Sequence, residues 1–140
     1  MERISLENCN CFHARKAARQ LTQMYDAILA PAGIRSTQYM ILAVLQQRGG
    51  LSVNDLAGLM VIDRTAMGKN LKPLERDGLI AVNISEEDRR SRIVTLTKNG
   101  SKVLEQAYPL WRLAQARFEK KHGKEFSAGL RGMLHQVAQD

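Results

Sequence analysis

Residues 52–77 read SVNDLAGLMVIDRTAMGKNLKPLERD, and two helix starts are visible in them. Ser52 is followed three residues later by Asp55, a spacing that lets side chains satisfy free backbone N–H groups at the start of a helix. Asp63 can cap a second helix in the same way. The stretch therefore predicts two short helices that are joined by a tight turn at Val61-Ile62.

The second of these helices has two different faces. When its residues are placed at about 100° each, Met67, Leu71 and Leu74 fall within one narrow arc, which we expect to pack inward. A different arc holds glycine and the polar and basic residues Arg64, Thr65, Gly68, Lys69, Lys72 and Arg76. Pro73 lies inside the helix, where it removes one backbone donor and should bend the helix.

A hairpin with a charged tip is expected after this pair of helices. Residues 79–84 and 92–97 are typical of two strands, and the polar residues 85–91 connect them. The tip carries Asp88 together with three arginines, which are Arg89, Arg90 and Arg92. Two short helices followed by such a hairpin have the plan of a winged helix-turn-helix.

Two helices are predicted before this unit. The first spans residues 8–29, and the second runs from about 36 to 47. Ser36 or Thr37 can cap the second helix. Its residues are apolar nearly all round, so we expect this helix to be central and buried.

Two amphipathic helices are predicted after the hairpin. Thr97 can cap a long helix, and Pro109 should kink it. A last helix follows Gly123 and carries an apolar stripe of Phe126, Leu130, Leu134 and Val137. The terminal stripes have no obvious partner within one chain, although they can also pack on each other. The expected fold is mainly α with a small β-hairpin wing.

The composition favours one domain with a polyanionic partner. The 140 residues include 21 Lys and Arg against 14 Asp and Glu, which gives a net charge of +7 and favours partners such as nucleic acid. The longest unbroken apolar run, Tyr39–Leu45, is too short to cross a bilayer, and the first residues do not resemble a secretory signal. Only Cys9 and Cys11 are cysteines, which suits a reducing cytoplasm.

The motifs of common enzymes are missing from the sequence. It contains no glycine-rich phosphate loop, no Gly-x-Ser-x-Gly turn and no His-Glu-x-x-His pair. The histidines His13, His122 and His135 stand alone. We therefore expect neither catalytic residues nor a cofactor.

The basic helix is narrow enough to enter the major groove of DNA, where base edges can be distinguished. The residues expected nearest the bases are Arg64, Thr65, Met67 and Lys69, with Asn70 at the flank of that face. Lys72 and Arg76 lie further along and suit phosphate contacts, while the arginine-bearing hairpin can reach a neighbouring minor groove. Two alternatives stay open: an ordinary solvated face, and an architectural protein that binds DNA without sequence preference.

Further motifs surround the hairpin. They are Leu74-Glu75-Arg76-Asp77-Gly78-Leu79-Ile80, then Asp88-Arg89-Arg90, then Leu96-Thr97 and Gly100. Together with the helix pair 52–77, these residues resemble the MarR-type transcriptional regulators over most of the chain. Pro73 departs from the pattern of that family, which has no proline at this position.

The resemblance implies a homodimer that binds a pseudo-palindromic operator in double-stranded DNA, and a small molecule or oxidant that tunes DNA affinity. It implies a winged helix-turn-helix flanked by dimerisation helices. Residues 1–33 and 99–140 would then serve dimerisation, and residues 34–98 would form the DNA-binding lobe. By the same resemblance Asp88 braces the wing and Arg90 faces the groove, with Arg89 as a second candidate. The regulator is expected to be a repressor.

Cys9, Cys11 and His13 form an unusual local cluster. A metal ion needs converging ligands, but on a helix Cys9 and His13 share a face while Cys11 points away. No second cluster of ligands exists in the sequence, so we expect no metal site. The favoured interpretation is that both cysteines are small buried residues that merely pack.

A thiol switch is the alternative interpretation of this cluster. Cys11 resembles the reactive cysteine of the family's organic-hydroperoxide-sensing branch, and Tyr25 and Tyr39 match tyrosines that this branch uses near its thiol. Arg15 stands where the branch has another tyrosine, four residues after the cysteine. A nearby cation or a helix N-terminus can lower the pKa of a thiol.

A small-molecule pocket is a further possibility that the resemblance implies. In this family a pocket lies between the dimer helices and the DNA-binding lobe. The candidates to line it are His13, Lys16, Tyr25, Tyr39 and Trp111, and a cation among them would suit an aromatic carboxylate. The alternative is that the aromatic residues belong to the core.

Overall fold

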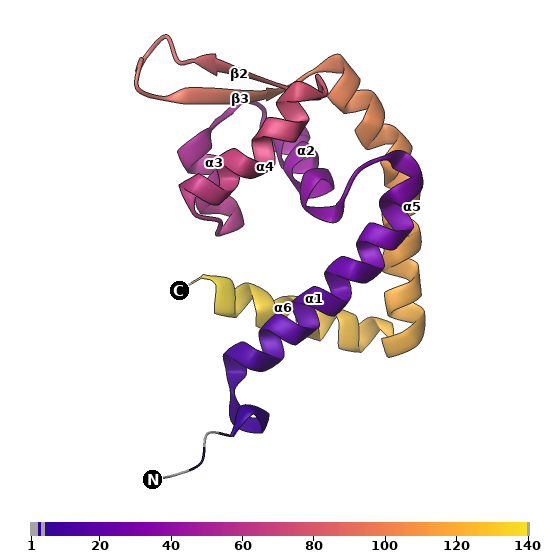
Figure 1. Ribbon diagram of the computed structural model, residues 1–140. Helices are drawn as coiled ribbons and strands as arrows, with labels where there is room; N and C mark the ends of the chain where they lie inside the picture. Colours follow the sequence, from indigo (N-terminus) through magenta and orange to yellow (C-terminus); the bar gives the residue numbers. More distant parts are fainter. Residues whose placement is uncertain (1–2, 4, 140) are drawn as a thin grey trace.

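The computed structural model describes residue 3 and residues 5–139, and helices make up most of it (Figure 1). The elements in chain order are η1 Leu6–Asn8, α1 Asn10–Leu29, η2 Ala30–Ala32, α2 Ser36–Arg48, β1 Leu51–Ser52, α3 Val53–Met60, α4 Arg64–Arg76, β2 Ile80–Ile84, β3 Arg92–Leu96, α5 Lys98–His122 and α6 Lys124–Ala138. The expected order of helices and hairpin is confirmed, and both α4 and α5 continue through the proline inside them.

The helix pair α3 and α4 begins where its caps predict. The hydroxyl of Ser52 accepts the N–H of Asp55 at 3.0 Å, and Oδ1 of Asp63 accepts the N–H of Ala66 at 2.9 Å. Each cap satisfies a backbone donor that has no partner within its own helix. These two side chains therefore fix where each helix of the pair starts.

The cap expected for α2 was wrong. Ser36 is the first residue of α2, and its N–H donates to Oδ1 of Asp26 in α1 at 2.7 Å. The side chain of Gln38 accepts the N–H of Arg35 at 2.9 Å. The helix is therefore capped by a residue from another helix and by its own third residue, and neither Ser36 nor Thr37 supplies the cap.

The core lies around α2, as its apolar sequence predicts. Ile41 and Leu42 are fully buried, and they join Leu74 of α4 and Val94 of β3 in one cluster. Burying one such side chain stabilises the fold by roughly 1.5–3 kcal/mol. This cluster holds α2, α4, the sheet and the first half of α5 together.

The sheet has one strand more than the sequence predicts. Its order is β1-β3-β2 with all pairs antiparallel, and Val94 lies opposite both Leu51 and Val82. The two residues of β1 form a strand only because β3 pairs with them. The wing is thus tied to the start of α3 as well as to its own hairpin partner.

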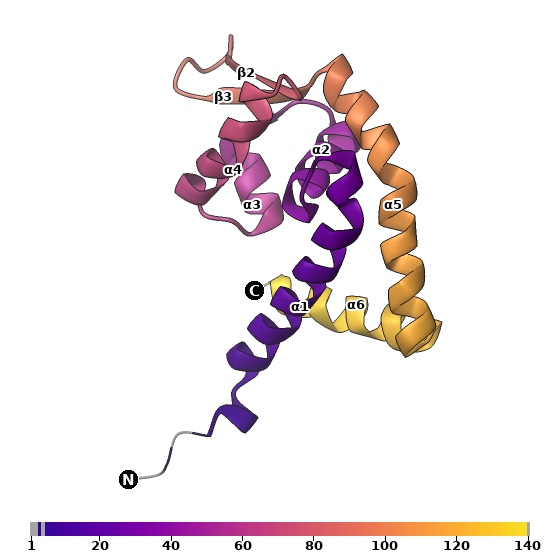
Figure 2. The same cartoon turned by 45° about the vertical axis from the view of Figure 1, so that its right-hand side comes forward.

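The wing and α6 lie at opposite ends of the molecule, and α5 runs between them (Figures 1 and 2). α1 packs along α5, while its first half extends away from the other helices in both views. Within the described part of the chain, no single helix is long and apolar enough to cross a membrane. α1 with η2 and α2 pass that test only as a pair, which is bent by 73°.

Candidate nucleic-acid interface

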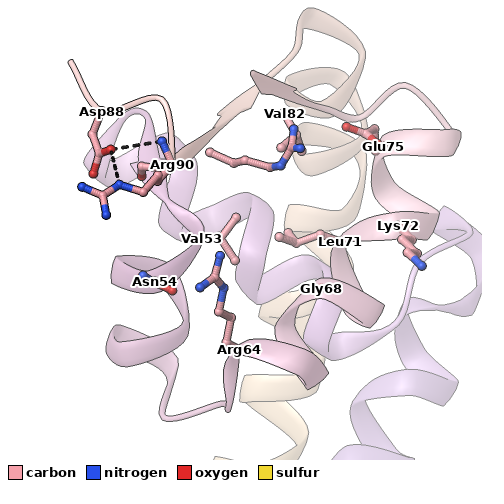
Figure 3. Close-up of a pocket in the computed structure, with 12 residues that line it drawn as sticks. Val53, Asn54, Arg64, Gly68, Leu71, Lys72, Glu75, Val82, Asp88 and Arg90 are labelled. Atoms are coloured by element: carbon pink, nitrogen blue, oxygen red, sulfur yellow. Dashed lines mark hydrogen bonds and ion pairs between the residues drawn. The ribbon is translucent and has the colours of Figure 1, made fainter. Parts of the chain in front are cut away.

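A groove of about 590 Å³ lies between the helix pair and the wing (Figure 3). It is lined by Val53, Asn54, Arg64, Gly68, Leu71, Lys72, Glu75, Val82, Asp88, Arg90, Ser91 and Arg92. Four of these side chains are cations and two are carboxylates. The groove is therefore basic, and it is bounded by two of the features that the sequence assigns to DNA binding.

The exposed face of α4 carries most of the predicted contact residues. Arg64, Thr65, Lys69, Lys72 and Arg76 are all exposed. In Figure 3 the side chain of Arg64 points into the groove towards Val53. Asn70 is half-buried, and its amide donates to the carbonyl oxygen of Ala66 at 3.0 Å, so it lies at the flank of this face as expected.

Met67 was placed wrongly among the base-contacting residues. Its side chain is fully buried in the core with Leu71 and Leu74. These three residues share the inward arc of α4 because positions three and four apart lie on the same face of a helix. Met67 therefore packs the helix onto the lobe and cannot reach a base.

The wing tip is a turn built around Asp88. Its Oδ1 accepts the N–H of Arg90 at 3.0 Å, and its own N–H donates to the hydroxyl of Ser85 at 3.3 Å. The Nε of Arg90 lies 3.8 Å from the same Oδ1, and the arginine side chain is 97% exposed. Arg89 and Arg92 are also exposed. Three cations are thus held at the end of a thin hairpin.

The sequence did not identify three polar residues of this groove, which are Asn54, Glu75 and Ser91. Asn54 is the second residue of α3 and is exposed. The feature of the sequence that could have identified Asn54 as a groove residue is its place in the first turn of α3, beside the cap. Glu75 brings a negative charge to the groove, and no simple pattern in the sequence places it there.

The effector candidates fall into separate places. A cavity of about 250 Å³ between α1, α2, α5 and α6 is lined by residues that include Tyr25, Trp111 and Arg131. A second cavity of about 570 Å³ lies between α2 and α5 and includes Tyr39 and Trp111. The Tyr39 and Tyr108 rings stack on Trp111 with centroids 6.1 and 6.0 Å away.

Tyr25 and Tyr39 are the aromatic residues with perturbed acidity. Burial raises the pKa of Tyr25; Arg131 opposes this shift and Glu119 adds to it. Burial also raises the pKa of Tyr39, and Tyr108 adds to the shift. The Tyr25 hydroxyl donates to Oε1 of Gln115. Both phenols therefore favour the neutral, hydrogen-bonding form.

Within one chain, Cys9, Cys11, His13 and Lys16 line neither of these two cavities. They lie in or beside the first two turns of α1, and His13 and Lys16 are exposed. Tyr25 lies fourteen positions after Cys11 in α1, which places the two residues about 21 Å apart along the helix axis. The expected single pocket that includes His13 and Lys16 is therefore not formed by one chain.

The two cysteines are not a buried pair. Cys9 is half-buried and caps α1, since its Sγ accepts the N–H of Phe12 at 3.4 Å. Cys11 is exposed, and Nε of Arg15 donates to its Sγ at 3.4 Å. Among the residues described, no three His, Cys, Asp or Glu side chains come together to hold a metal ion. The favoured interpretation of two buried, packed cysteines was wrong for Cys11.

Comparisons with known proteins find similar sequences among transcriptional regulators. The model of the MarR family matches residues 34–91. The organic hydroperoxide resistance transcriptional regulator of Bacillus subtilis is 32% identical over 106 residues, which cover 76% of this chain and 72% of that protein. The transcriptional repressor Rv2887 of Mycobacterium tuberculosis is 30% identical over 115 residues, 82% of this chain and 83% of its own length.

A solved structure is similar over nearly the whole chain. The transcriptional regulator MosR of M. tuberculosis, crystallised in complex with DNA, has a TM-score of 0.85 and 35% identity, and the match covers 94% of this chain and 95% of that one. The similarity thus includes α1, α5 and α6 as well as the lobe that carries the groove.

Proposed function

Since this chain belongs to the MarR family of transcriptional regulators, we propose that it is a sequence-specific repressor that holds operator DNA with α4 and the wing. The observation that carries this proposal is the basic groove between these two elements. We expect residues 34–98 to form the DNA-binding lobe, with residues 1–33 and 99–140 serving dimerisation.

In this proposal α4 lies in the major groove, where some of its residues contact bases and others contact phosphates. Arg64, Thr65 and Lys69 are exposed at its first two turns and would meet base edges, which carry sequence information. Lys72 and Arg76 lie further along and would meet phosphates, which set position but not sequence. Arg76 is already close to Asp77, with Nε 3.3 Å from Oδ1, so its phosphate contact would compete with that exposed ion pair.

The wing would add a contact in the neighbouring minor groove. The tip is narrow, and Asp88 holds the backbone of Arg90 while the guanidinium stays in solvent. A narrow minor groove has a strongly negative potential that attracts arginine. Arg89 is the second candidate because it lies in the same turn and is exposed.

Two copies of the chain would place two such lobes on one operator. α6 exposes large apolar side chains along one face, which are Phe126, Met133, Leu134 and Val137. Apolar surface of this kind on a helix is typical of a protein interface. A two-fold dimer binds two half-sites about 34 Å apart and so prefers a pseudo-palindromic sequence.

The decisive experiment is selection of duplexes from a random library by the purified protein, followed by competition with unrelated DNA. We expect one palindromic motif. Arg64→Ala and Lys69→Ala should relax base preference within this motif. Lys72→Ala should instead weaken binding to all duplexes alike and reduce the slope of log affinity against log salt concentration by about one. Equal binding to every duplex would instead identify an architectural DNA binder.

The cavity at Tyr25 is the site we propose for an aromatic carboxylate effector. It combines apolar walls with Arg131, which can pair with a carboxylate, and with the hydroxyl of Tyr25. A ligand that prefers one spacing of the two lobes shifts the population away from the DNA-bound form. Titrating benzoate-type acids into the operator complex should release DNA, and Arg131→Ala should raise the concentration required.

A second candidate function is a thiol switch at Cys11, which the exposed sulfur and its contact with Arg15 favour. A hydroperoxide would transfer one oxygen atom to the thiolate, which becomes a sulfenic acid while the peroxide leaves as an alcohol. Cys11 cannot meet Tyr25 of its own chain, so a tyrosine near the thiol would have to come from the second copy. Cys11→Ser should retain DNA binding and lose release by cumene hydroperoxide; release that persists in the variant excludes this thiol.

A further inference from the structure

Val61 has a backbone conformation that its side chain disfavours. It follows α3 with φ 54° and ψ 46°, and it is the one residue other than glycine with positive φ in the part of the chain that the structure describes. A β-branched residue is uncommon in this left-handed region because Cβ comes too close to the following carbonyl oxygen. The residue type is therefore not explained by its backbone.

The turn requires this conformation but not this side chain. The N–H of Val61 donates to the carbonyl oxygen of Gly58 at 3.3 Å, and the N–H of Ile62 donates to that of Ala57 at 2.9 Å. This is the Schellman motif, in which glycine usually takes the left-handed position. Ile62 packs against the core, whereas Val61 is 71% exposed. The isopropyl group of Val61 thus adds strain and very little packing.

Val61 comes just before the end of α4 that we propose reads bases. Asp63 caps α4 and Arg64 begins it, two and three residues after Val61. Leu59, in the last turn of α3, is another large apolar side chain that is exposed, at 42%. The apolar group that a major groove presents on its base edges is the 5-methyl group of thymine.

We propose that Val61 contacts the methyl group of one thymine in each operator half-site, beside the bases read by Arg64 and Thr65, and so selects thymine at that position. This inference rests on the proposed function. It explains why a strained and exposed valine stands in a turn that glycine would form more easily.

The test removes only the methyl group from the DNA. Each thymine of the selected operator is replaced in turn by deoxyuridine, and binding is measured for the wild type and for Val61→Gly and Val61→Asn. The wild type should lose about fourfold in affinity at one thymine per half-site, the effect of burying one methyl group. Both variants should lose that sensitivity, since glycine and asparagine tolerate the left-handed region and lack the isopropyl group.

Two controls separate this inference from the proposed function. Val61→Gly should raise the midpoint of urea unfolding, which shows that it is folded and relieved of strain. Lys72→Ala should weaken binding while the sensitivity to deoxyuridine persists. If Val61→Gly and the wild type respond alike to every deoxyuridine while base preference remains, only the Val61 contact is wrong. If the wild type has no base preference, the proposed function fails and the contact fails with it.

Discussion

Asp88 and Arg90 have different tasks at the wing tip, although they form an ion pair. Oδ1 of Asp88 accepts the backbone N–H of Arg90 at 3.0 Å, which shapes the turn. The guanidinium is 3.8 Å from that oxygen and its side chain is almost fully exposed. Because exposed ion pairs contribute little to stability, the cation is free to exchange its partner. The guanidinium can therefore leave Asp88 and bind DNA while the turn stays folded.

Replacing Arg90 by alanine should lower operator affinity roughly tenfold, since the side chain would lose its groove contact while the turn remains. Fluorescence anisotropy at one fixed salt concentration measures the change. Lys102→Ala is the matched control, because it removes one exposed cation from α5 outside the groove. An equal loss in both variants would mean that only the net charge matters.

Tyr25 makes stability depend on pH in the alkaline range. Burial raises its pKa above the ordinary 10.0, against the opposing effect of Arg131. The folded state thus holds the phenolic proton more tightly than the unfolded chain does. The resulting stability is fully present below pH 10 and is lost as the pH rises through the higher folded pKa. Tyr25→Phe should therefore flatten the fall of the urea midpoint above pH 10, and an unchanged slope would contradict this assignment.

At the scale of elements, one corner connects the wing to α5. Oγ1 of Thr97 accepts the N–H of Gly100 at 3.0 Å and donates to the carbonyl oxygen of Gly78 at 2.6 Å. Gly100 is buried against the backbone of Leu79. The hairpin and the long helix are thus fixed to each other at the point where a movement of α5 would reach the proposed DNA-binding lobe.

Gly100→Ala should destabilise the protein by about 3 kcal/mol, the upper range for overpacking a core. A Cβ atom at this position would overlap the carbonyl oxygen of Leu79 and lie 2.7 Å from Cδ1 of Leu96. Urea unfolding followed by circular dichroism gives the free energy. Gly58→Ala is the control: its Cβ meets open space, so it should stabilise α3 by about 0.5–1 kcal/mol. A stable Gly100→Ala protein would show that the corner is more open than described.

The range of an interaction decides how far the elements could be predicted from the sequence. The caps at Ser52 and Asp63 lie three residues from the groups they satisfy, and both were predicted. β1 was missed because Leu51 is held by Val94, far along the chain. The cap of α2 was wrong because its acceptor is Asp26 in another helix. Contacts between distant segments leave no local pattern.

The errors at the site have a different origin, because the local geometry of a helix already argues against both of them. The exposed arc of α4 follows from the helical period, and the same period places Met67 on the buried face. Met67 was counted among the base contacts because it lies near the start of α4, although its side chain faces the core. The residues in the first turns of α1 belong to the same helix as Tyr25 but are not close to it in space. A helix keeps such residues about 1.5 Å apart per position along its axis, so they line no common cavity in one chain.

At the scale of the whole molecule, the apolar surface lies far from the wing. Phe126, Met133, Leu134 and Val137 of α6 are between 47% and 70% exposed, and they share one arc of the helix at about 100° per residue. α6 lies at the end of α5 opposite to the wing (Figures 1 and 2). A single copy gives this face no cover, and two copies joined through it would leave both wings free for DNA.

The double variant Met133→Glu, Val137→Glu should therefore separate the two copies without unfolding either. Met133 is 61% and Val137 70% exposed, so a folded monomer loses little packing, whereas carboxylates in an interface lose their hydration. Sedimentation velocity should show a single chain of 15.7 kDa in place of a dimer. Operator affinity should fall at least about a hundredfold, because linked binding of two half-sites is lost. Ala128→Glu adds the same charge to the opposite, exposed face of α6 and should leave the dimer intact. A double variant that sediments as the wild type does would exclude this face as the interface.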